Sequence, residues 1–316
     1  KHGGKENAPG FNNTAALVRN FFGIVIQQDC KLVHHGPVLL IGGCKLLQAD
    51  VFCFRFVAGL ESGLEPGFKY FKDGFSFQTG VGGPSLAVNR FLEEHMRREN
   101  ITMSFALGGT SSAICDLQDK GLVNYILDTQ DFDQGAAAHL FSNPKHIEID
   151  LSEYANAGNK GAYVNKLDYV VLSALEIDTK FNVNVITGSD GVLRGAPGGH
   201  PDTAAGSKCC IIVTPLTRGR MATVCKDVVT VTTPGDCVDV LVTDYGVAVN
   251  PARQDIIDCL DAAGIQHVSI ESLQEKAYSL VGEPDPLQWE DKVVAIVEAR
   301  DGTILDVVRQ VKPLVL

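Results

Sequence analysis

The sequence predicts an α/β fold with a mostly parallel sheet covered by helices on both faces. Leu167–Ala174 is a predominantly apolar run, which is typical of a parallel strand buried on both sides. Segments in which apolar residues recur at helical spacing lie between such runs, so the apolar period changes repeatedly along the chain. The Asp-Gly dipeptide in Ala299-Arg-Asp-Gly302 is a hairpin signal, and it predicts an antiparallel element at the C-terminal end.

The individual elements follow from the same patterns. We expect a helix over Ser85–Arg98, because Leu86, Val88, Leu92 and Met96 recur at helical spacing among charged residues. The other predicted strands are Ile101–Leu107, Val123–Asp128, the alternating Phe181–Thr187, Ile211–Thr214, Val228–Val231, Val238–Val242, Lys292–Glu298 and Thr303–Val311. The other predicted helices are Ser111–Lys120, Arg253–Ala263, which Gly264 ends, and Ser272–Val281.

The domain boundary is predicted at Glu61-Ser-Gly-Leu-Glu-Pro-Gly67, which is rich in turn residues. It separates residues 1–69, which we assign to no known unit, from one domain over residues 70–316. A chain of 316 residues is long enough to bury a substantial core.

Composition excludes several classes of protein. A net charge of −11 argues against unaided binding to nucleic acid or to an anionic membrane. Since no apolar run reaches the roughly 20 residues that span a bilayer and no export signal is visible, we expect a cytoplasmic protein. The nine cysteines include no CxxC pair, which favours reduced, mostly buried thiols over a disulfide framework. We predict no metal site, because His34 and His35 are adjacent and His200 has no neighbour at ligand spacing.

Two glycine-rich loops suggest a site for an anion. Gly195–Gly206 lies between two strand-like runs, and its Asp202-Thr-Ala-Ala segment resembles a helix start. Gly80-Val-Gly-Gly-Pro-Ser85 also leads into a helix. Glycines before a helix expose backbone N–H groups that suit a carboxylate, a phosphate or a developing oxyanion. An ordinary connecting loop is the alternative, but two such loops favour a site that holds an anionic acyl donor or acceptor.

A dinucleotide site is disfavoured in the second loop. Ser85 stands where the third glycine of that fingerprint is expected, and no acidic residue follows in the required context. We therefore assign Gly80, Gly82 and Gly83 to substrate binding through the backbone.

Four long sequence motifs resemble one family. They are Gly74–Val88, Ser173-Ala-Leu-Glu-Ile-Asp-Thr-Lys-Phe-Asn-Val-Asn-Val185, Gly191–Gly206 and Asn250-Pro-Ala-Arg-Gln-Asp255. In order and spacing they resemble the second half of citrate lyase alpha subunits, the citrate CoA-transferase component, from about Tyr70 to Lys312. The resemblance implies a CoA-transferase fold related to ribose-5-phosphate isomerase. It also implies exchange of acetate for citrate on an acyl-carrier thioester, as part of a lyase complex in citrate fermentation.

The resemblance further implies partners and a route. The implied partners are a beta subunit and an acyl carrier (gamma) subunit in an oligomer. The acyl group is carried by CoA or by a dephospho-CoA-derived prosthetic group on a carrier subunit, and the resemblance implies no cofactor bound directly by this chain. Related CoA-transferases carry a glutamate at the end of the strand that matches Ser104–Gly109, but no acidic residue occurs between Asn100 and Cys115. Direct attack by a citrate carboxylate is then the implied reaction, without a glutamyl–CoA intermediate. Ala106 and Leu107 also fit an ordinary core.

The predicted catalytic residues are Gly198, Gly199 and His200, with Arg194 and Arg253 as the cations that meet citrate. His200 has an alternative as a neutral donor that positions the loop, and Asp202 fits a helix cap better than a catalyst. The other charged groups near the loop are Arg218, Arg220, Glu176 and Asp178, which also fit a solvated surface or a polar strand end. The alternative function is a catalytically silent binding or assembly module that kept the fold and lacks its first domain.

Overall fold

A computed structural model of the chain describes residues 71–80 and 83–312, all of which belong to one compact unit, Lys45–Leu316. The boundary expected near Glu61–Gly67 lies outside the described residues, so the division at residue 69 stays a prediction. None of the helices described is both long enough and apolar enough to cross a membrane.

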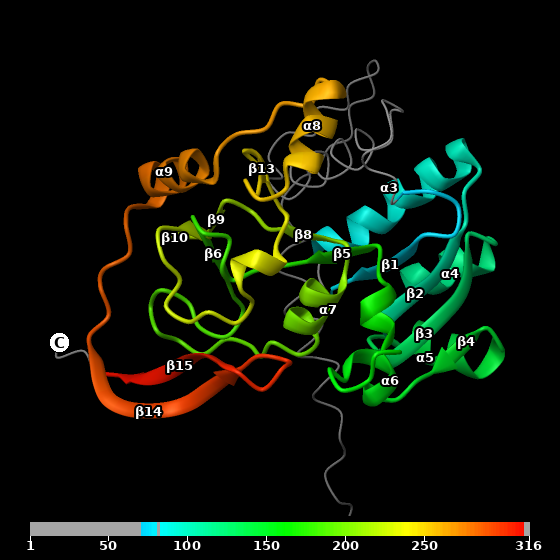
Figure 1. Cartoon of the computed structure of the whole chain (residues 1–316), viewed down its shortest axis with the longest axis horizontal. Coiled ribbons are helices and arrows are strands. Elements are labelled where there is room, and N and C mark those ends of the chain that lie inside the picture. Colours follow the sequence, from blue (N-terminus) through cyan, green and yellow to red (C-terminus); the bar gives the residue numbers. More distant parts are fainter. Residues whose placement is uncertain (1–70, 81–82, 313–316) are drawn as a thin grey trace, which may run out of the picture. The chain divides into compact units, whose positions relative to one another are not determined.

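An eight-stranded sheet forms the centre of the fold (Figure 1). Its strand order is β13-β12-β8-β5-β1-β2-β3-β4, and all neighbours are parallel except β12 and β13. The strands are β1 Ser76–Thr79, β2 Met103–Thr110, β3 Val123–Asp131, β4 His146–Glu148, β5 Tyr169–Leu172, β8 Cys209–Val213, β12 Val240–Thr243 and β13 Gly246–Val249. The predicted fold class is therefore confirmed.

Three small sheets and the helices complete the unit. The small sheets are β11 Val224–Cys225 with β6 Glu176–Asp178 and β7 Val183–Asn184, β9 Thr217–Arg218 with β10 Met221–Ala222, and the C-terminal hairpin of β14 Trp289–Glu298 and β15 Ile304–Val311. The helices are α3 Gly83–Glu99, α4 Ser112–Asp119, α5 Gln134–Ser142, α6 Leu151–Ala155, α7 His200–Gly206, α8 Gln254–Ala262 and α9 Ile270–Val281, with 3-10 turns at Tyr163–Lys166 and Gly235–Cys237.

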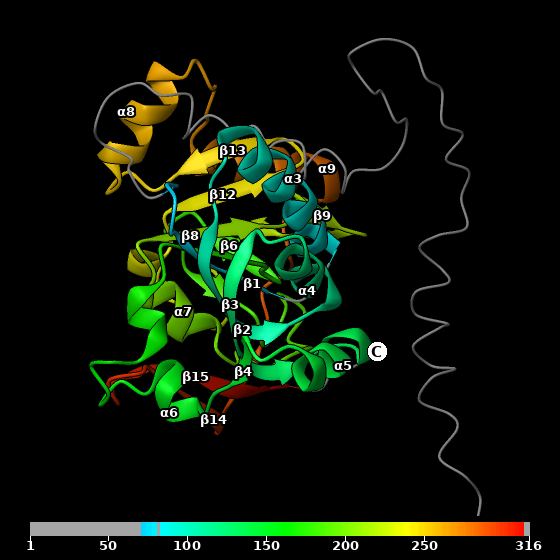
Figure 2. The same ribbon diagram turned by 90° about the vertical axis from the view of Figure 1, so that its right-hand side faces the viewer.

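Both faces of the sheet are buried. Val171 packs with the side chains of α3, α4 and α8, whereas its neighbours Val170 and Leu172 pack with α7 and α9 on the opposite face. Successive side chains of a strand point to opposite faces of the sheet. A continuously apolar strand such as β5 therefore packs against apolar side chains on each face. Figure 2 shows α4 and α5 on one side of β2 and β3, and α6 and α7 on the other.

Two element predictions are wrong. Val228–Val231 forms no strand, because its backbone N–H groups bond to side chains: Val228 N donates to Asp178 and Val231 N donates to Asp306 of the hairpin. The helix of the main glycine loop begins at His200 with Gly199 as its N-cap, so Asp202 lies inside the first turn instead of capping it. Proline occupies the second helical position, where its missing N–H costs no helical hydrogen bond.

Candidate functional site

A cavity of about 770 Å³ opens where the parallel strands β1, β2, β3 and β5 end. The carboxyl edge of such a sheet is the usual place for a ligand in this class of fold. The cavity is lined by Gln78, Thr79, Gly80, Gly109, Thr129, Gln130, Phe132, Leu151, Tyr154, Ala155, Asn156, Leu172, Ser173, Val185, Ala196, Pro197, Gly198, Gly199, His200 and Asp202. The two glycine loops therefore reach one cavity, through Gly80 and through Gly198 and Gly199.

The glycines of the main loop are needed for two different reasons. Gly198 has a φ of +51°, which a side chain disfavours although nothing stands within 4 Å of a Cβ there. A Cβ on Gly199 would collide with the hydroxyl of Tyr154. Within the described part of the chain, the backbone N–H groups of Gly198 and Gly199 have no hydrogen-bond partner. The loop thus presents two unused donors at the cavity.

The end of β2 is also built from glycine. Gly108 has a φ of +94°, and the ladder to β3 shifts register between Gly108 and Gly109. The Gln78 amide lies against Gly108 at 2.6 Å from a Cβ position, and the Phe132 ring covers Gly109 so closely that a Cβ would overlap it. These glycines leave room for Gln78 and Phe132 in the cavity wall, and the strand end offers no carboxylate nucleophile.

Gln78 and Tyr154 supply a fixed polar pair in the wall. The amide nitrogen Nε2 of Gln78 donates to the Tyr154 hydroxyl over 2.9 Å, and the amide oxygen Oε1 is buried without a partner among the described residues. Burial raises the pKa of Tyr154, so its hydroxyl stays protonated at neutral pH. The remaining atom is the carbonyl oxygen Oε1, an acceptor, so a ligand hydroxyl would satisfy it by donating.

His200 lines the cavity, but both of its ring nitrogens are occupied. Nε2 donates to the Ser173 carbonyl over 2.9 Å, and Nδ1 accepts from the Thr233 hydroxyl over 2.9 Å. Burial lowers the pKa of His200 to about 4, so the ring is neutral. These contacts tie the first turn of α7 to the residue that follows β5 and favour the alternative of a neutral His200 that positions the loop, while a catalytic role stays a prediction.

Asp202 and Arg300 form an ion pair at the cavity, which the sequence analysis missed. Asp202 is the one acidic residue among the described residues of the lining, and burial raises its pKa. Arg300 places Nε 3.5 Å from the Asp202 carboxylate and donates to the Ala155 carbonyl from another nitrogen. Arg300 lies in the hairpin turn, about a hundred residues from α7, and no local motif connects the two.

Arg194 does not line the cavity. Its guanidinium holds Asp190 with two nitrogens and lies 3.8 Å from the Met221 sulfur. The pKa of Arg194 is raised, chiefly by its hydrogen bond to Asp190. The structure thus places Arg194 outside the lining of the cavity, although it lies four residues before Gly198, and its role in binding citrate stays a prediction.

Arg253 is also placed away from the lining. It pairs with Asp239 over 2.6 Å and with Asp255 over 2.8 Å, at the start of α8. Those carboxylates raise its pKa, with Asp255 the largest cause. Both pairs hold Arg253 at the start of α8, outside the lining of the cavity, and its role as a citrate cation stays a prediction.

The remaining charged residues of the prediction also lie outside the lining of the cavity. Arg218 donates to the Ala174 carbonyl and the Thr214 hydroxyl, and Arg220 lines a different cavity. Glu176 accepts from Ser189, and Asp178 accepts from the backbone of its own turn. Gly82 lies outside the described residues, and Gly83 begins α3.

The cysteines of residues 71–312 are free thiols. They are Cys115, Cys209, Cys210, Cys225, Cys237 and Cys259, and all are buried or half-buried. Burial raises the pKa of each, to about 12 for Cys115. The prediction of reduced, buried thiols is confirmed for this part of the chain.

Comparisons with known proteins agree on one family. Residues 65–311 match the family described as "Citrate lyase, alpha subunit (CitF)". The citrate lyase alpha chains of Escherichia coli (strain K12) and Klebsiella pneumoniae are 60% and 59% identical over 243 residues, which cover 77% of this chain and 48% of each relative. The chain thus spans about half the length of the curated relatives it matches.

Solved structures give the same picture. A crystal structure of a Streptococcus mutans protein, named as an alpha subunit of citrate lyase in complex with citrate, is 47% identical with a TM-score of 0.80 and covers 89% of this chain and 53% of its own. A Pseudomonas malonate decarboxylase hetero-tetramer in complex with malonate reaches a TM-score of 0.51 at 12% identity, covering 74% of this chain and 49% of its own. The latter likeness shows the fold alone.

Proposed function

The chain belongs to the citrate lyase alpha-subunit family, and we propose that it carries the citrate site of a citrate CoA-transferase. The proposed reaction exchanges acetate for citrate on a thioester: acetyl carrier and citrate give citryl carrier and free acetate. The proposed carrier is an acyl carrier (gamma) subunit with a dephospho-CoA-derived arm, and a beta subunit then cleaves the citryl group. The proposal sets the reaction in the cytoplasm and in an oligomeric complex.

The cavity is the observation that carries this proposal. Its two unpartnered N–H groups, at Gly198 and Gly199, suit a carboxylate oxygen or a developing oxyanion. Neutral polar side chains line the same cavity, among them those of Gln78, Asn156 and Ser173. The Streptococcus mutans relative, named as a citrate complex, supports a tricarboxylate as the ligand of this family.

The proposed route needs no enzyme carboxylate. A citrate carboxylate oxygen attacks the acetyl thioester carbonyl, and the carbon–sulfur bond breaks to release the carrier thiolate and a mixed citryl–acetyl anhydride. The thiolate then attacks the citryl carbonyl of that anhydride, which releases acetate and forms the citryl thioester. Both attacks build negative charge on a carbonyl oxygen, and the N–H groups of Gly198 and Gly199 would stabilise it.

Charge compensation is the demanding part of the proposal. Citrate is a trianion at neutral pH, yet no lysine or arginine occurs among the described residues that line the cavity. Arg300 pairs with the lining residue Asp202, which brings one cation to the cavity wall. We therefore expect Arg300 to contribute to the positive charge that citrate requires.

A product assay tests the proposal. The chain is incubated with acetyl-CoA and labelled citrate, and acetate and citryl-CoA are measured by mass spectrometry, alongside the intact mass of the protein. We expect both products in equal amounts, no acyl or CoA adduct on the protein, and transfer retained in Asp202→Asn. A stoichiometric aspartyl or glutamyl thioester would contradict direct attack. Binding of citrate without any transfer, also in the full-length protein, would favour the silent binding module.

A further inference from the structure

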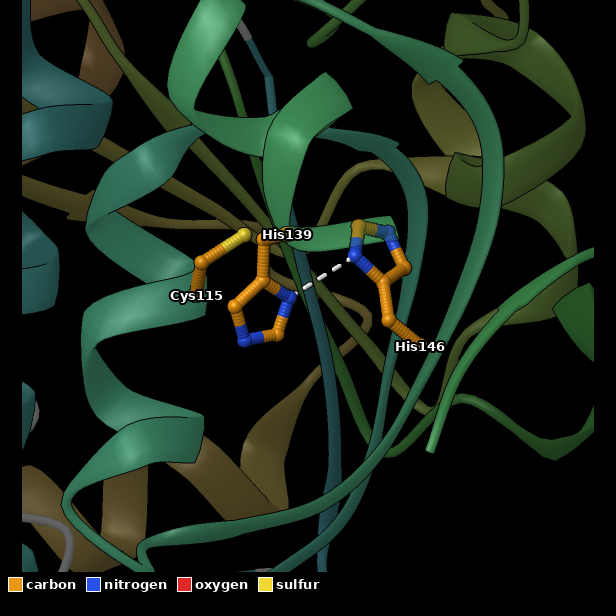
Figure 3. A group of neighbouring side chains, drawn as sticks. All are labelled: Cys115, His139 and His146. Atoms are coloured by element: carbon orange, nitrogen blue, oxygen red, sulfur yellow. Dashed lines mark hydrogen bonds between the residues drawn. The ribbon is translucent and has the colours of Figure 1, made fainter. Parts of the chain in front are cut away.

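Three side chains outside the cavity converge from different elements at the β4 edge of the sheet. Cys115 comes from α4, His139 from α5, and His146 is the first residue of β4. Their exposed fractions are 3%, 9% and 4%. The Cys115 sulfur and one nitrogen of each ring lie within 4.8 Å of one another, and Figure 3 shows the three side chains pointing into one space.

The two rings face each other through the same type of atom. Nδ1 of His139 lies 3.0 Å from Nδ1 of His146. Nε2 of His146 lies 3.2 Å from the Asp128 carboxylate, and because a carboxylate accepts, Nε2 carries the proton. The lone pair of His146 Nδ1 is therefore directed at His139. This contact requires a hydrogen or a cation between the two nitrogens.

The contacts of His139 Nε2 fit either a hydrogen or a cation between the two Nδ1 atoms. Its Nε2 lies 3.3 Å from an Asp119 carboxylate oxygen, which suits an N–H donor, and 3.2 Å from the Asn143 amide nitrogen, which suits an acceptor. When Asp119 accepts from Nε2–H of His139, as Asp128 does from Nε2–H of His146, the Nδ1 atoms of both histidines are unprotonated. A carboxylate behind each ring is the usual support of metal-binding histidines, because it fixes the tautomer and raises basicity.

We propose that Cys115, His139 and His146 bind a zinc-type divalent cation through Sγ and the two Nδ1 atoms. One thiolate and two imidazoles form a ligand set that zinc prefers, with water in the fourth position. Tetrahedral geometry with Zn–N near 2.0–2.1 Å sets the two nitrogens about 3.3 Å apart. The observed 3.0 Å needs only a slight opening. On binding, the Cys115 thiol releases its proton to solvent as the sulfur–metal bond forms.

The proposed ion has a structural role that follows from its position. β4 pairs with β3 over only three residue positions, from Ile126–His146 to Asp128–Glu148, and it is an edge strand. An ion held by α4, α5 and β4 joins that short strand to α4 and α5. This inference is independent of the proposed citrate chemistry, since none of the three ligands lines the cavity.

Metal analysis of the purified full chain tests the proposal. After treatment with a chelator and dialysis against zinc, we expect one zinc per chain and about one proton released per zinc bound. Cobalt in place of zinc should give a thiolate-to-metal absorption band in the unmodified protein, which needs no variant to fold. A chain that binds no zinc, or that shows no such band, would overturn the proposal and leave a proton between the histidines.

Matched variants identify the ligands. Cys115→Ser and His139→Gln should weaken zinc binding by more than the roughly 10- to 100-fold that loss of an outer partner costs. Cys225→Ser removes an equally buried thiol outside the cluster and should leave binding unchanged. Asp128, Asp131 and His146 form an alternative cluster for a harder cation. Binding that is lost in Asp131→Asn and kept in Cys115→Ser would refute the thiolate site.

Discussion

Strand β3 contributes to two regions that are built in opposite ways. Thr129 and Gln130, near its carboxyl end, line the cavity, where the donors are backbone N–H groups and neutral side chains. Asp128, one residue earlier, contacts His146 in the buried cluster, where the contacts join ionisable side chains. The proposed anion site is thus made mainly by backbone conformation, whereas the proposed cation site is made by side chains brought together by packing.

The largest expected effect comes from a change in the cavity, at Gly199. In Gly199→Ala the added methyl group collides with Tyr154, so the loop has to move. A displacement of about 1 Å in a reacting geometry costs on the order of a hundredfold, and we expect kcat/KM for citrate to fall by that factor or more. Steady-state acetate release by the full-length enzyme measures it.

The control for this variant is a glycine outside the cavity. Gly264 has a φ of +67° with open space around it, and Gly264→Ala should lower stability by about 1 kcal/mol without affecting transfer. Equal activity losses in the two variants would mean that the main loop acts only through stability.

A pH experiment separates positioning from catalysis at His200. Its folded pKa of about 4 lies below the usual 6.5, so the unfolded chain binds this proton more readily than the folded protein. The stability from a neutral His200 is present above pH 6.5 and is lost as the pH falls toward 4. In urea unfolding, we expect the unfolding free energy of wild type to fall by about 3 kcal/mol more than that of His200→Gln over this window. Parallel curves for the two proteins would show that His200 is not held neutral.

Removal of zinc probes the side-chain region alone. A ligand that binds only the folded protein stabilises it by RT ln(1 + [L]/Kd), about 1.4 kcal/mol at ten times Kd. Zinc should therefore raise the thermal midpoint of the wild-type chain and have no effect on Cys115→Ser. An identical zinc response in both proteins would argue against the cluster.

The smallest effect is expected at Arg194. Its pair with Asp190 is partly solvent-exposed, with side-chain exposures of 33% and 41%, and exposed pairs contribute about 0.2–1 kcal/mol. Arg194→Ala should change the unfolding free energy by less than about 1 kcal/mol and leave citrate use near the parental value. Arg300→Ala, which loses contacts to Asp202 and Ala155, should weaken citrate use more. The reverse order would restore Arg194 as the citrate cation.

The sequence predicted the regions whose information is local. The loop of Gly198 and Gly199 is a contiguous glycine-rich motif, and runs such as Leu167–Ala174 have the composition of buried parallel strands. Both could therefore be predicted from the sequence. The helix boundary at His200 was misplaced because an Asp in the first turn imitates a cap.

The parts that were missed depend on tertiary packing. Arg300 reaches α7 only because the hairpin folds back to it. His139 and His146 lie on α5 and β4, two short elements that the periodicity did not indicate, and neither has ligand spacing to Cys115 along the chain. Arg194 shows the converse, since a residue four positions before Gly198 pairs with Asp190 and lies outside the cavity lining.

A crystal structure of the chain with citrate tests the central claim most directly. The account predicts citrate in the cavity at the ends of β1, β2, β3 and β5, with a carboxylate oxygen accepting from the N–H of Gly198 or Gly199. Citrate bound outside this cavity, beside Arg194 and Asp190 or beside Arg253, would contradict it.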